Sequence, residues 1–354
     1  MAAPPTAERI AVIRLGALGD VVRTLPAVSA LRAGYPAARL SWVVEAPSAS
    51  LLEAQPWIDE VLVFPRAELV ARVRARAFRD AWTGLGGFLG ALRARRFDLV
   101  VDFHSILKSG LLALASGARL RAGYAWPYGR EASWLLCNER ARLALDRCSR
   151  FARNAALVEF LGVAADPDPE PLRIPAESRR RMRAELGARA PVVLHPGTSD
   201  GTPYKRWTPE AYAKVAVALS EAPGVPVIVT SGPARDDREL ADAIVKGSAG
   251  AACHAPETGS LLDLAALLRE SRLYVGSDTG PMHVASLSGT PVVQILGPTD
   301  PCENQPYPGT PSRSVRVPVA CSPCRRGCSA ATCMRGVSPE LVIAAARDLL
   351  AGHP

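Results

Sequence analysis

LYVGSDTGPMH, residues 273–283, is the stretch that decides the fold of this chain. Its apolar beginning predicts a buried parallel strand, and the residues after His283 predict a helix. Asp278 or Thr279 is suited to cap that helix, and Pro281 is suited to its first turn. Such a turn directs backbone N–H groups toward the carboxyl edge of a sheet, where phosphates bind. The alternative is a capped strand-to-helix turn that holds no ligand.

The same alternation of strand and helix runs outward through the chain in both directions. Apolar runs predict strands at residues 9–14, 40–44, 61–64, 99–103, 119–124, 191–194, 225–229, 273–276 and 291–295. Helical patterns occupy the segments between them, among them a helix over 21–32 and another over 67–96 with a glycine-rich break at 84–87. Each crossover is long enough for a parallel βαβ unit, so we expect an α/β fold.

A proline-rich segment divides the chain. Residues 164–171 carry Pro at every second position near their end, a pattern typical of an extended linker. We therefore expect a first domain at 1–163, a linker at 164–175 and a second domain at 176–354. The two halves are built alike, as two open parallel-sheet domains that face each other across a cleft.

Composition and charge indicate a soluble globular protein of 354 residues with 48% hydrophobic and 21% charged residues. The net charge is +8, and residues 1–175 hold 23 Lys and Arg against 17 Asp and Glu, a balance of +6. A basic first half suits an anionic partner, although an Arg-rich solvated surface would look the same. No secretory signal or membrane-spanning run is visible in the sequence, so we expect a cytoplasmic protein.

Two polar loops follow strands in the first half. The loop at 15–20 has two glycines without the spacing of a dinucleotide fingerprint, and it ends in Asp20. Asp20 is either the N-cap of the next helix or a general base in the cleft. The loop after the strand at 99–103 carries His104 and Lys108, which are candidates for binding the acceptor of a transfer reaction.

Three loops of the second half are rich in glycine and hydroxyl residues. They lie at 197–199, 231–233 and 277–283, each after a predicted strand. Thr198 and Ser199 can donate to phosphate oxygens, and Lys205 would add a compact positive charge beside a diphosphate. The alternatives are an exposed loop cation for Lys205 and a packing role for His283.

Three segments together resemble a known family. They are Ile10–Pro26, His195–Trp207 and Asp278–His283, in that order. The combination resembles the ADP-heptose:lipopolysaccharide heptosyltransferases of glycosyltransferase family 9, which have a GT-B fold of two Rossmann-like domains. The resemblance covers nearly the whole chain.

The resemblance implies an inverting, metal-independent transfer of L-glycero-D-manno-heptose from ADP-heptose to the inner core of lipopolysaccharide. It implies Asp20 as the general base and Lys205 as a catalytic cation. The residues it implies for binding ADP-heptose are Thr198, Ser199, Lys205, Asp236, Asp278, Thr279, Gly280 and His283. Asp236 matches least closely, because a longer Glu is expected at that place.

The resemblance also implies the surroundings of the enzyme. We expect no cofactor, no nucleic-acid partner and a monomer that meets its anionic, Kdo- or heptose-bearing lipid acceptor at the cytoplasmic face of the inner membrane. The arginine-rich helices between residues 66 and 96 are candidates for docking to that surface.

Four cysteines near the C-terminal end form a separate motif. Their spacing is tight enough for a structural Zn²⁺ or an Fe–S cluster but does not match the usual paired zinc pattern. We expect reduced thiols or a redox-labile pair rather than bound metal, and no catalytic role, for Cys321, Cys324, Cys328 and Cys333.

Two other functions remain open from the residues. One is a GT-B transferase or sugar epimerase that uses a different nucleotide sugar. The other, from a different class, is a basic nucleic-acid-binding protein with a zinc module. The second leaves the phosphate-type loops unexplained and shows no aromatic stacking platform.

Overall fold

The computed structural model describes residues 4–143, 147–166, 170–187, 189–199, 201–221, 225–324 and 327–352. The chain divides into two compact units, Met1–Arg173 and Ile174–Pro354. The division falls inside the predicted linker, of which residues 167–169 lie outside the described residues.

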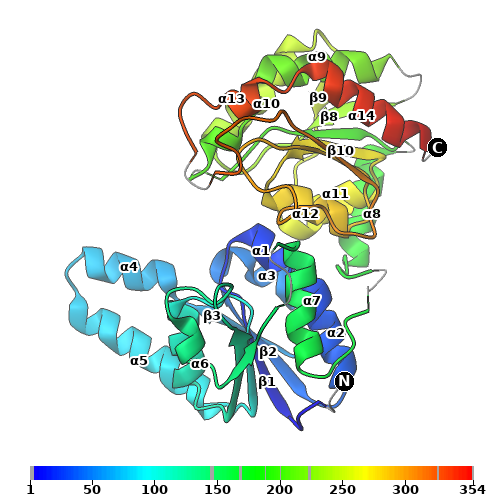
Figure 1. The fold of residues 1–354 in the computed structure, drawn as a ribbon. Helices are drawn as coiled ribbons and strands as arrows, with labels where there is room; N and C mark the ends of the chain where they lie inside the picture. Colours follow the sequence, from blue (N-terminus) through cyan, green and yellow to red (C-terminus); the bar gives the residue numbers. More distant parts are fainter. Residues whose placement is uncertain are drawn as a thin grey trace. The chain divides into compact units, whose positions relative to one another are not determined.

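A six-stranded, wholly parallel sheet forms the centre of the first unit, in the order β3-β2-β1-β4-β5-β6. Its strands are β1 (Arg9–Ile13), β2 (Arg39–Glu45), β3 (Glu60–Phe64), β4 (Leu99–Asp102), β5 (Leu120–Tyr124) and β6 (Glu139–Ala141). Its helices are α1 (Leu18–Val22), α2 (Leu25–Gly34), α3 (Ala49–Glu53), α4 (Arg66–Arg74), α5 (Phe78–Ala94), α6 (Leu107–Ala115) and α7 (Arg150–Phe160), with short 3₁₀ turns at Ala46–Ser48 and Ser133–Leu135. Figure 1 shows α2 and α7 on one face of this sheet and α5 and α6 on the other.

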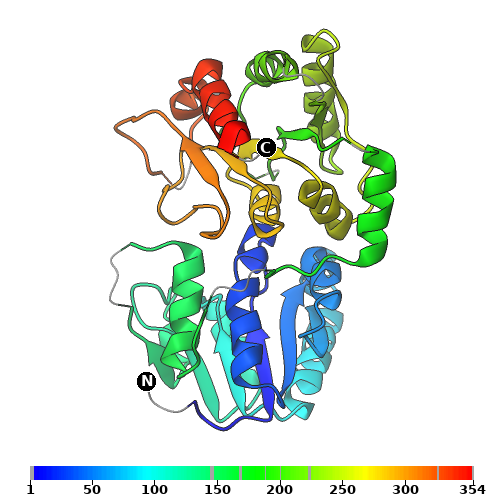
Figure 2. The same cartoon turned by 90° about the vertical axis from the view of Figure 1, so that its right-hand side faces the viewer.

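The second unit repeats this plan, with the sheet order β12-β11-β10-β7-β8-β9 and parallel pairing throughout. Its strands are β7 (Val192–His195), β8 (Val227–Val229), β9 (Ala252–His254), β10 (Leu273–Ser277), β11 (Val292–Ile295) and β12 (Ser312–Val315). Its helices are α8 (Ala176–Leu186), α9 (Pro209–Ser220), α10 (Arg235–Gly247), α11 (Leu261–Arg269), α12 (Gly280–Leu287), α13 (Thr332–Arg335) and α14 (Pro339–Gly352), with a 3₁₀ turn at Pro203–Lys205. Figure 2 shows helices on both faces of this sheet as well.

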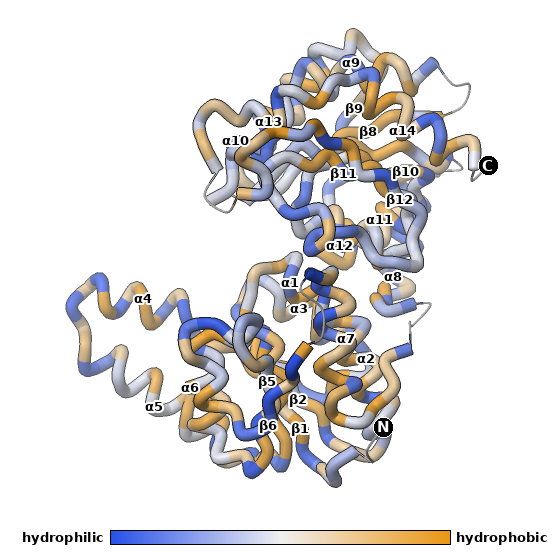
Figure 3. Tube along the Cα trace, viewed as in Figure 1, coloured by the Kyte–Doolittle hydropathy of each residue, from blue (hydrophilic) through white to orange (hydrophobic). Residues whose placement is uncertain are grey.

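Each unit has its own hydrophobic core. In the first unit, alternate residues of the strands, such as Ala11 and Ile13 of β1, face a cluster that includes Leu92 of α5 and Leu112 of α6. In the second unit, a larger cluster joins the central strands to α9, α10 and α14. Figure 3 shows the apolar character of these strands along the trace. The prediction of an α/β fold with two Rossmann-like, open parallel-sheet domains is therefore confirmed.

Two predicted helices differ from the structure. The helix predicted over 21–32 is two helices, because Pro26 at the start of α2 has no N–H to continue the bonding of α1. The helix predicted over 67–96 does break, but at residues 75–77 rather than in the glycine-rich segment 84–87. Arg76 takes a left-handed conformation there (φ 58°), and the N–H of Ala77 donates back to the carbonyl of Arg72. The glycines continue the helix α5.

Three strands were missing from the sequence prediction, namely β6, β9 and β12. Each has three or four residues, and each is paired with one neighbour only. Short edge strands need little apolar surface, so they leave no clear pattern in the sequence. Among the helices of the described segments, none has the length and apolar character that a membrane span would need.

Candidate active site

The loops with predicted functional residues flank the point of the first sheet where its strand order reverses. From β1 the chain adds β2 and β3 on one side, and it then returns to add β4, β5 and β6 on the other. Ligands of open α/β sheets bind at such a switch point, outside the carboxyl ends of the strands. Asp20 follows β1, and both His104 and Lys108 follow β4. The structure therefore places these three residues in or directly after the two loops beside the switch point.

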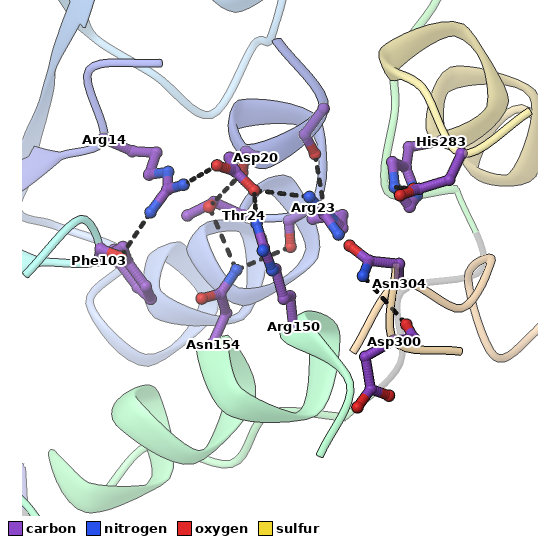
Figure 4. Close-up of polar contacts among 12 residues, drawn as sticks. Arg14, Asp20, Arg23, Thr24, Phe103, Arg150, Asn154, His283, Asp300 and Asn304 are labelled. Atoms are coloured by element: carbon purple, nitrogen blue, oxygen red, sulfur yellow. Dashed lines mark hydrogen bonds and ion pairs between the residues drawn. The ribbon is translucent and has the colours of Figure 1, made fainter. Parts of the chain in front are cut away.

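Three arginines surround the carboxylate of Asp20 (Figure 4). Its Oδ1 lies 2.6 Å from Nη2 of Arg23 and 2.5 Å from Nη1 of Arg150, and its Oδ2 pairs with Arg14. Burial alone would raise the pKa of Asp20, but the charges of the three arginines outweigh it and hold the pKa well below its usual value. Asp20 is the third residue of α1 and not its N-cap, which is Ala17, so the cap interpretation is wrong.

Hydrogen bonds tie this ion cluster to two further parts of the first unit (Figure 4). Nη1 of Arg14 donates to the carbonyl of Phe103, 3.0 Å away, in the loop after β4. Nδ2 of Asn154, from α7, donates to the carbonyl of Arg23 over 3.0 Å. The carboxylate of Asp20 is therefore held in place by groups from the β1 loop, the β4 loop and α7.

Asp102, which is buried, and His104, which is half-buried, are neighbouring polar residues at the end of β4. The carboxylate of Asp102 accepts from the N–H groups of His104 (3.0 Å) and Ser105 (2.9 Å) and from Oγ of Ser109 (2.8 Å). Burial raises the pKa of Asp102 to about 6 despite these bonds. Burial, together with the charge of Arg14, lowers the pKa of His104 to about 3, so its ring is neutral at neutral pH. In the described residues, the buried Nδ1 of His104 has no hydrogen-bond partner.

Lys108 belongs to a second charged cluster of the first unit. Its Nζ lies 2.8 Å from Oε1 of Glu45 at the end of β2, and 5.7 Å from the ring centre of Phe64. Arg66 pairs with Oε2 of the same glutamate over 3.1 Å. Two cations share one carboxylate, so the cluster keeps a positive charge that suits an anionic group.

The second sheet has the same kind of switch point, between β7 and β10. The loop after β7 carries Thr198, Ser199 and Lys205, and the loop after β10 carries Asp278 and Thr279. Because β7 and β10 are neighbours, the two loops open at the same edge of the sheet.

Lys205, Asp278 and His283 are in contact across these two loops. Nζ of Lys205 lies 3.0 Å from Oδ2 of Asp278 and donates to the Asp278 carbonyl over 3.3 Å. Nε2 of His283 lies 3.5 Å from Oδ1 of the same aspartate. The side chains of Asp278 and His283 are 6% and 1% exposed, whereas Lys205 is 17% exposed, so the ammonium is the outermost of the three groups. These three predicted residues are therefore one cluster.

The hydroxyl pair after β7 is engaged within its own loop. Oγ1 of Thr198 donates to the carbonyl of Thr202 (3.1 Å), and Oγ of Ser199 lies 2.8 Å from Oγ1 of Thr202. Nε of Arg206 donates to Oγ1 of Thr198 over 3.2 Å. These bonds shape the loop around Lys205, and Ser199 remains on its exposed side.

Two neighbouring aspartates at the start of α10 behave differently. Asp236 is 73% exposed and lies 3.8 Å from Arg206, whereas Asp237 is 11% exposed and lies 3.5 Å from the same guanidinium. The sequence prediction named Asp236 and did not single out its buried neighbour Asp237. The helical periodicity of α10 could have indicated that Asp237 is buried, because Asp237 lies on the same face of the helix as Ala241 and Ile244.

Thr279 and Gly280 open α12. Thr279 is the N-cap in extended conformation, its side chain makes no capping hydrogen bond, and Pro281 lies in the first turn. Oγ1 of Thr279 instead donates to the carbonyl of Ser277 at 3.4 Å. Gly280 has no side chain, so a ligand can approach the positive end of the helix dipole closely.

The C-terminal cysteines line a small cavity of about 30 Å³ together with Tyr204. All eight cysteines of the chain are free thiols, and burial raises the pKa of Cys333. Within the described residues, no group of three or more His, Cys, Asp and Glu side chains is arranged to hold a metal ion. The cavity is lined by all four cysteines of the C-terminal motif, namely Cys321, Cys324, Cys328 and Cys333.

Comparison with known proteins agrees with this architecture. Among solved structures, the glycosyl transferase family 9 protein of Veillonella parvula superposes with a TM-score of 0.77 at 23% identity, and the match covers 98% of this chain and 97% of that one. The E. coli ADP-heptose lps heptosyltransferase II superposes with a TM-score of 0.73 at 23% identity, over 97% and 99% of the two chains. The fold is therefore of the GT-B type that the resemblance implied.

Sequence relatives identify the family. Lipopolysaccharide heptosyltransferase 1 of Pseudomonas aeruginosa is 30% identical over 330 residues, which cover 89% of this chain and 86% of the relative. The lipopolysaccharide core heptosyltransferase OpsX of Haemophilus influenzae is 26% identical over 309 residues, or 85% and 82% of the two chains. The profile of Glycosyltransferase family 9 (heptosyltransferase) matches residues 87–334. The chain is therefore a glycosyltransferase and belongs to glycosyltransferase family 9.

Proposed function

We propose that this glycosyltransferase moves L-glycero-D-manno-heptose from ADP-heptose to the inner core of lipopolysaccharide, with inversion at the anomeric carbon. The names of its relatives support the sugar and the acceptor class. The observation that carries the donor site is the contact of Lys205, Asp278 and His283 at the switch point of the second sheet. Loops at this edge of an open α/β sheet are where nucleotides bind.

Lys205 would stabilise the leaving ADP. Its ammonium has three N–H donors, of which Asp278 takes two, so one donor remains for a phosphate oxygen. The dipole at the start of α12, beside Gly280, adds positive potential where the diphosphate gains charge. We assign Thr198, Ser199 and Thr279 to the phosphates. The O–H groups of Thr198 and Thr279 would turn to the phosphate oxygens from the loop carbonyls that they bond here. We assign Asp236 to the nucleoside.

Asp20 is the proposed general base. The acceptor hydroxyl oxygen forms a bond to the anomeric carbon, the bond from that carbon to the phosphate oxygen breaks, and ADP leaves with the electron pair. The hydroxyl proton passes to the carboxylate of Asp20. A single displacement of this kind inverts the configuration, and general base catalysis typically contributes about 10²–10⁴-fold.

The arginines around Asp20 set the timing of this proton transfer. Because they hold the pKa of Asp20 well below its usual value, the carboxylate is ionised and ready at neutral pH, but it is a weak base. It gains the proton only after the attacking oxygen has begun to bond to carbon and its hydroxyl has become strongly acidic. The cluster that includes Arg14, Arg23 and Arg150 keeps the carboxylate aimed until then.

We assign His104 and Lys108 to the acceptor. The neutral ring of His104 can accept or donate a hydrogen bond to a sugar hydroxyl, and Lys108 with Arg66 can pair with acidic groups of the acceptor. The acceptor is a Kdo- or heptose-bearing lipid, so we place the reaction of the monomeric enzyme at the cytoplasmic face of the inner membrane.

We also propose that the transfer needs no divalent metal, because Lys205 and the start of α12 supply the charge that a metal would bring to the diphosphate. Turnover is expected to be unchanged by a chelator. A loss of turnover in chelator that added Mg²⁺ restores would contradict this part of the proposal.

Titration with nucleotides separates the proposal from a related enzyme with another donor. ADP is expected to bind more tightly than UDP, and Lys205→Ala is expected to weaken ADP binding by about tenfold or more, the usual value of a charged hydrogen bond. Lys214→Ala is the matched control, because Lys214 is an exposed lysine of α9.

The titration has a clear negative outcome. Tighter binding of UDP would assign the chain to the rival enzyme, and an equal ADP affinity of the Lys205→Ala and Lys214→Ala variants would remove Lys205 from the site. Transfer of heptose to a core acceptor in the presence of ADP-heptose then tests the reaction itself.

A further inference from the structure

The helices α4 and α5 form a hairpin that extends from the first unit. No residue of α4 is buried, and of the 17 residues of α5 only Ala81 and Leu92 are. Figure 1 shows that the connection between the two helices is the part of the hairpin farthest from the sheet. In Figure 3, hydrophilic and hydrophobic segments alternate along α4 and α5. The hairpin therefore presents a large mixed surface to its surroundings.

The apolar stripe of α5 is longer than the core that it covers. Toward its C-terminal end the stripe packs on the core through Leu85, Phe88, Leu89 and Leu92. The same stripe continues toward the hairpin connection with Phe78 and Trp82, which are 61% and 78% exposed. On α4, Val70 and Val73 are 41% and 50% exposed, so both helices carry unburied apolar side chains.

Exposed apolar side chains are concentrated in the first unit. Among the described residues, the second unit exposes only two large apolar side chains, Val217 and Leu341. The first unit exposes eleven, of which four lie on the hairpin and three more, at 107, 111 and 114, form a stripe on α6. Figure 1 shows α6 next to α5, and a concentration of this kind is typical of an interaction site.

The positive charge of the first half lies in the same segment. Residues 66–96 contain eight arginines against Glu68 and Asp80, a balance of +6. Four of the arginines, at 72, 74, 76 and 79, lie around the hairpin connection, whereas those at 93, 95 and 96 lie at the opposite end of α5, where Arg95 pairs with Glu60. The balance of +6 equals the whole excess of residues 1–175, which hold 23 basic and 17 acidic residues. Outside this segment, the charges of the remaining 15 basic and 15 acidic residues of that half cancel each other.

We propose that the α4–α5 hairpin docks to the surface of an anionic lipid bilayer, with Phe78 and Trp82 inserted at the level of the head groups. Aromatic side chains prefer that depth, and arginines beside them bind lipid phosphates while their stems lie along the apolar region. A protein partner would explain the apolar residues but not the concentrated charge. A nucleic acid would explain the charge but not the exposed valines. The inference assigns a surface and its residues to the membrane placement proposed above, and it does not depend on which sugar or acceptor the enzyme uses.

Vesicle binding tests the inference directly. The full chain is mixed with vesicles of phosphatidylcholine alone or of phosphatidylcholine with phosphatidylglycerol, and the bound fraction is measured by sedimentation. We expect binding only to the anionic vesicles. Arg74→Gln with Arg79→Gln should lower the partition coefficient by about thirtyfold, from the usual contribution of two cations near such a surface. Phe78→Ala with Trp82→Ala should lower it by at least about tenfold.

Matched controls distinguish docking from general charge or loss of structure. Lys214→Gln with Lys246→Gln removes two positive charges from exposed positions of the second unit and should leave binding unchanged. Val217→Ala with Leu341→Ala is the apolar control. All four double variants change exposed residues and should unfold at the temperature of the unchanged chain.

Three results would overturn the inference. The first is that the unchanged chain does not bind anionic vesicles, and the second is that hairpin variants and controls bind alike. The third is that the hairpin variants abolish a concentration-dependent dimer while vesicle binding is absent, which would assign the surface to a second copy of the chain. Because neither ADP-heptose nor acceptor is present, these results do not depend on whether the proposed reaction is correct.

Discussion

Three guanidinium groups around the Asp20 carboxylate form a dense cluster of charges in the first unit. Removal of Asp20 leaves like charges facing each other, and that costs about 3–5 kcal/mol in fully buried ion pairs and less in this partly buried cluster. A variant at Asp20 therefore affects both chemistry and stability, and an experiment must measure both.

Asp20→Asn is expected to lower turnover by about 10²–10⁴-fold, because the amide cannot take the proton of the acceptor hydroxyl. The affinity for ADP should be unchanged, since the proposed donor residues belong to the second unit. Turnover, ADP titration and thermal unfolding are measured on the same preparation.

Glu60→Gln is the matched control for Asp20→Asn. Glu60 also lies in the first unit and pairs with an arginine, Arg95, over 2.5 Å. It begins the edge strand β3 and so lies at the amino ends of the strands, whereas the candidate site lies at their carboxyl ends. This variant should lose stability and keep turnover. If Asp20→Asn retains full turnover, Asp20 is not the base.

The buried carboxyl of Asp102 predicts a pH dependence of stability. Its pKa is about 6 in the folded chain and about 3.9 in an unfolded one, so the folded state binds more protons between those values. Stability from this group therefore falls as pH rises from about 4 to about 6, by about 2–3 kcal/mol in total. Asp102→Asn should remove this slope in denaturant unfolding measured across the window. The same slope in both proteins would contradict the prediction.

Asp20 acts in the opposite direction and at lower pH. Its pKa is depressed in the folded chain, so its contribution to stability is present above the unfolded pKa and is lost only as pH falls through the folded value. Above a pH of about 4, His104 and His195 also contribute, because their lowered pKa values make stability rise with pH up to about 6.5. The contribution of Asp102 is therefore the difference between the unchanged chain and Asp102→Asn.

At the scale of elements, the loop after β8 and the loop after β7 both close on the carboxylate of Asp237. A Cβ at Gly232 would lie 2.3 Å from Oδ2 of Asp237, and a Cβ at Gly197 would lie 3.0 Å from its Oδ1. The start of α10 is held against these loops because both positions lack a side chain. Asp237 also approaches Arg206, which supports the Thr198 loop.

Gly232→Ala is expected to displace Asp237 and to destabilise the chain by about 1–3 kcal/mol, the usual cost of an added methyl group in a filled space. ADP binding should weaken as well, since the loop beside Lys205 loses its support. Gly201→Ala is the control, because no atom of the described residues lies within 4 Å of a Cβ there, apart from those of its chain neighbours. Equal unfolding temperatures of the two variants would show that the Asp237 contact is not needed.

Secondary-structure prediction failed where an element depended on its neighbours rather than on its own residues. Pro26 was visible in the sequence and marks the separation of α1 and α2, but the left-handed turn at Arg76 contains no glycine to signal it. The need for glycine at position 84 comes from the packing of the hairpin, because a Cβ there would clash with Nη1 of Arg72. The glycine there allows α4 and α5 to approach, rather than breaking a helix.

At the scale of the whole molecule, the two units have separate sheets and separate hydrophobic cores. The core of the second unit joins strands from β7 to β12 with α9, α10 and α14 and needs no residue before Ile174. This is the arrangement expected of domains that fold on their own.

A fragment of residues 174–354 is therefore expected to unfold cooperatively and to bind ADP with nearly the affinity of the full chain. Denaturant unfolding and calorimetric titration check the two parts, and the fragment with Lys205→Ala is the control for site-specific binding. A fragment that folds but does not bind ADP would show that the first unit supplies donor contacts.

Local sequence patterns were enough to predict the βα alternation, the two open parallel sheets and the loops in which Asp20, Lys205 and Asp278 lie. These follow from apolar runs, glycine turns and helix starts, which are local properties of the chain. Three features became known only from the folded chain. Arg150, 130 residues from Asp20, completes its ion cluster, Asp237 is buried beside Asp236, and Trp82 is exposed. Ion pairs and burial depend on which elements pack together, and that packing brings together residues whose separation along the chain has no periodic signal.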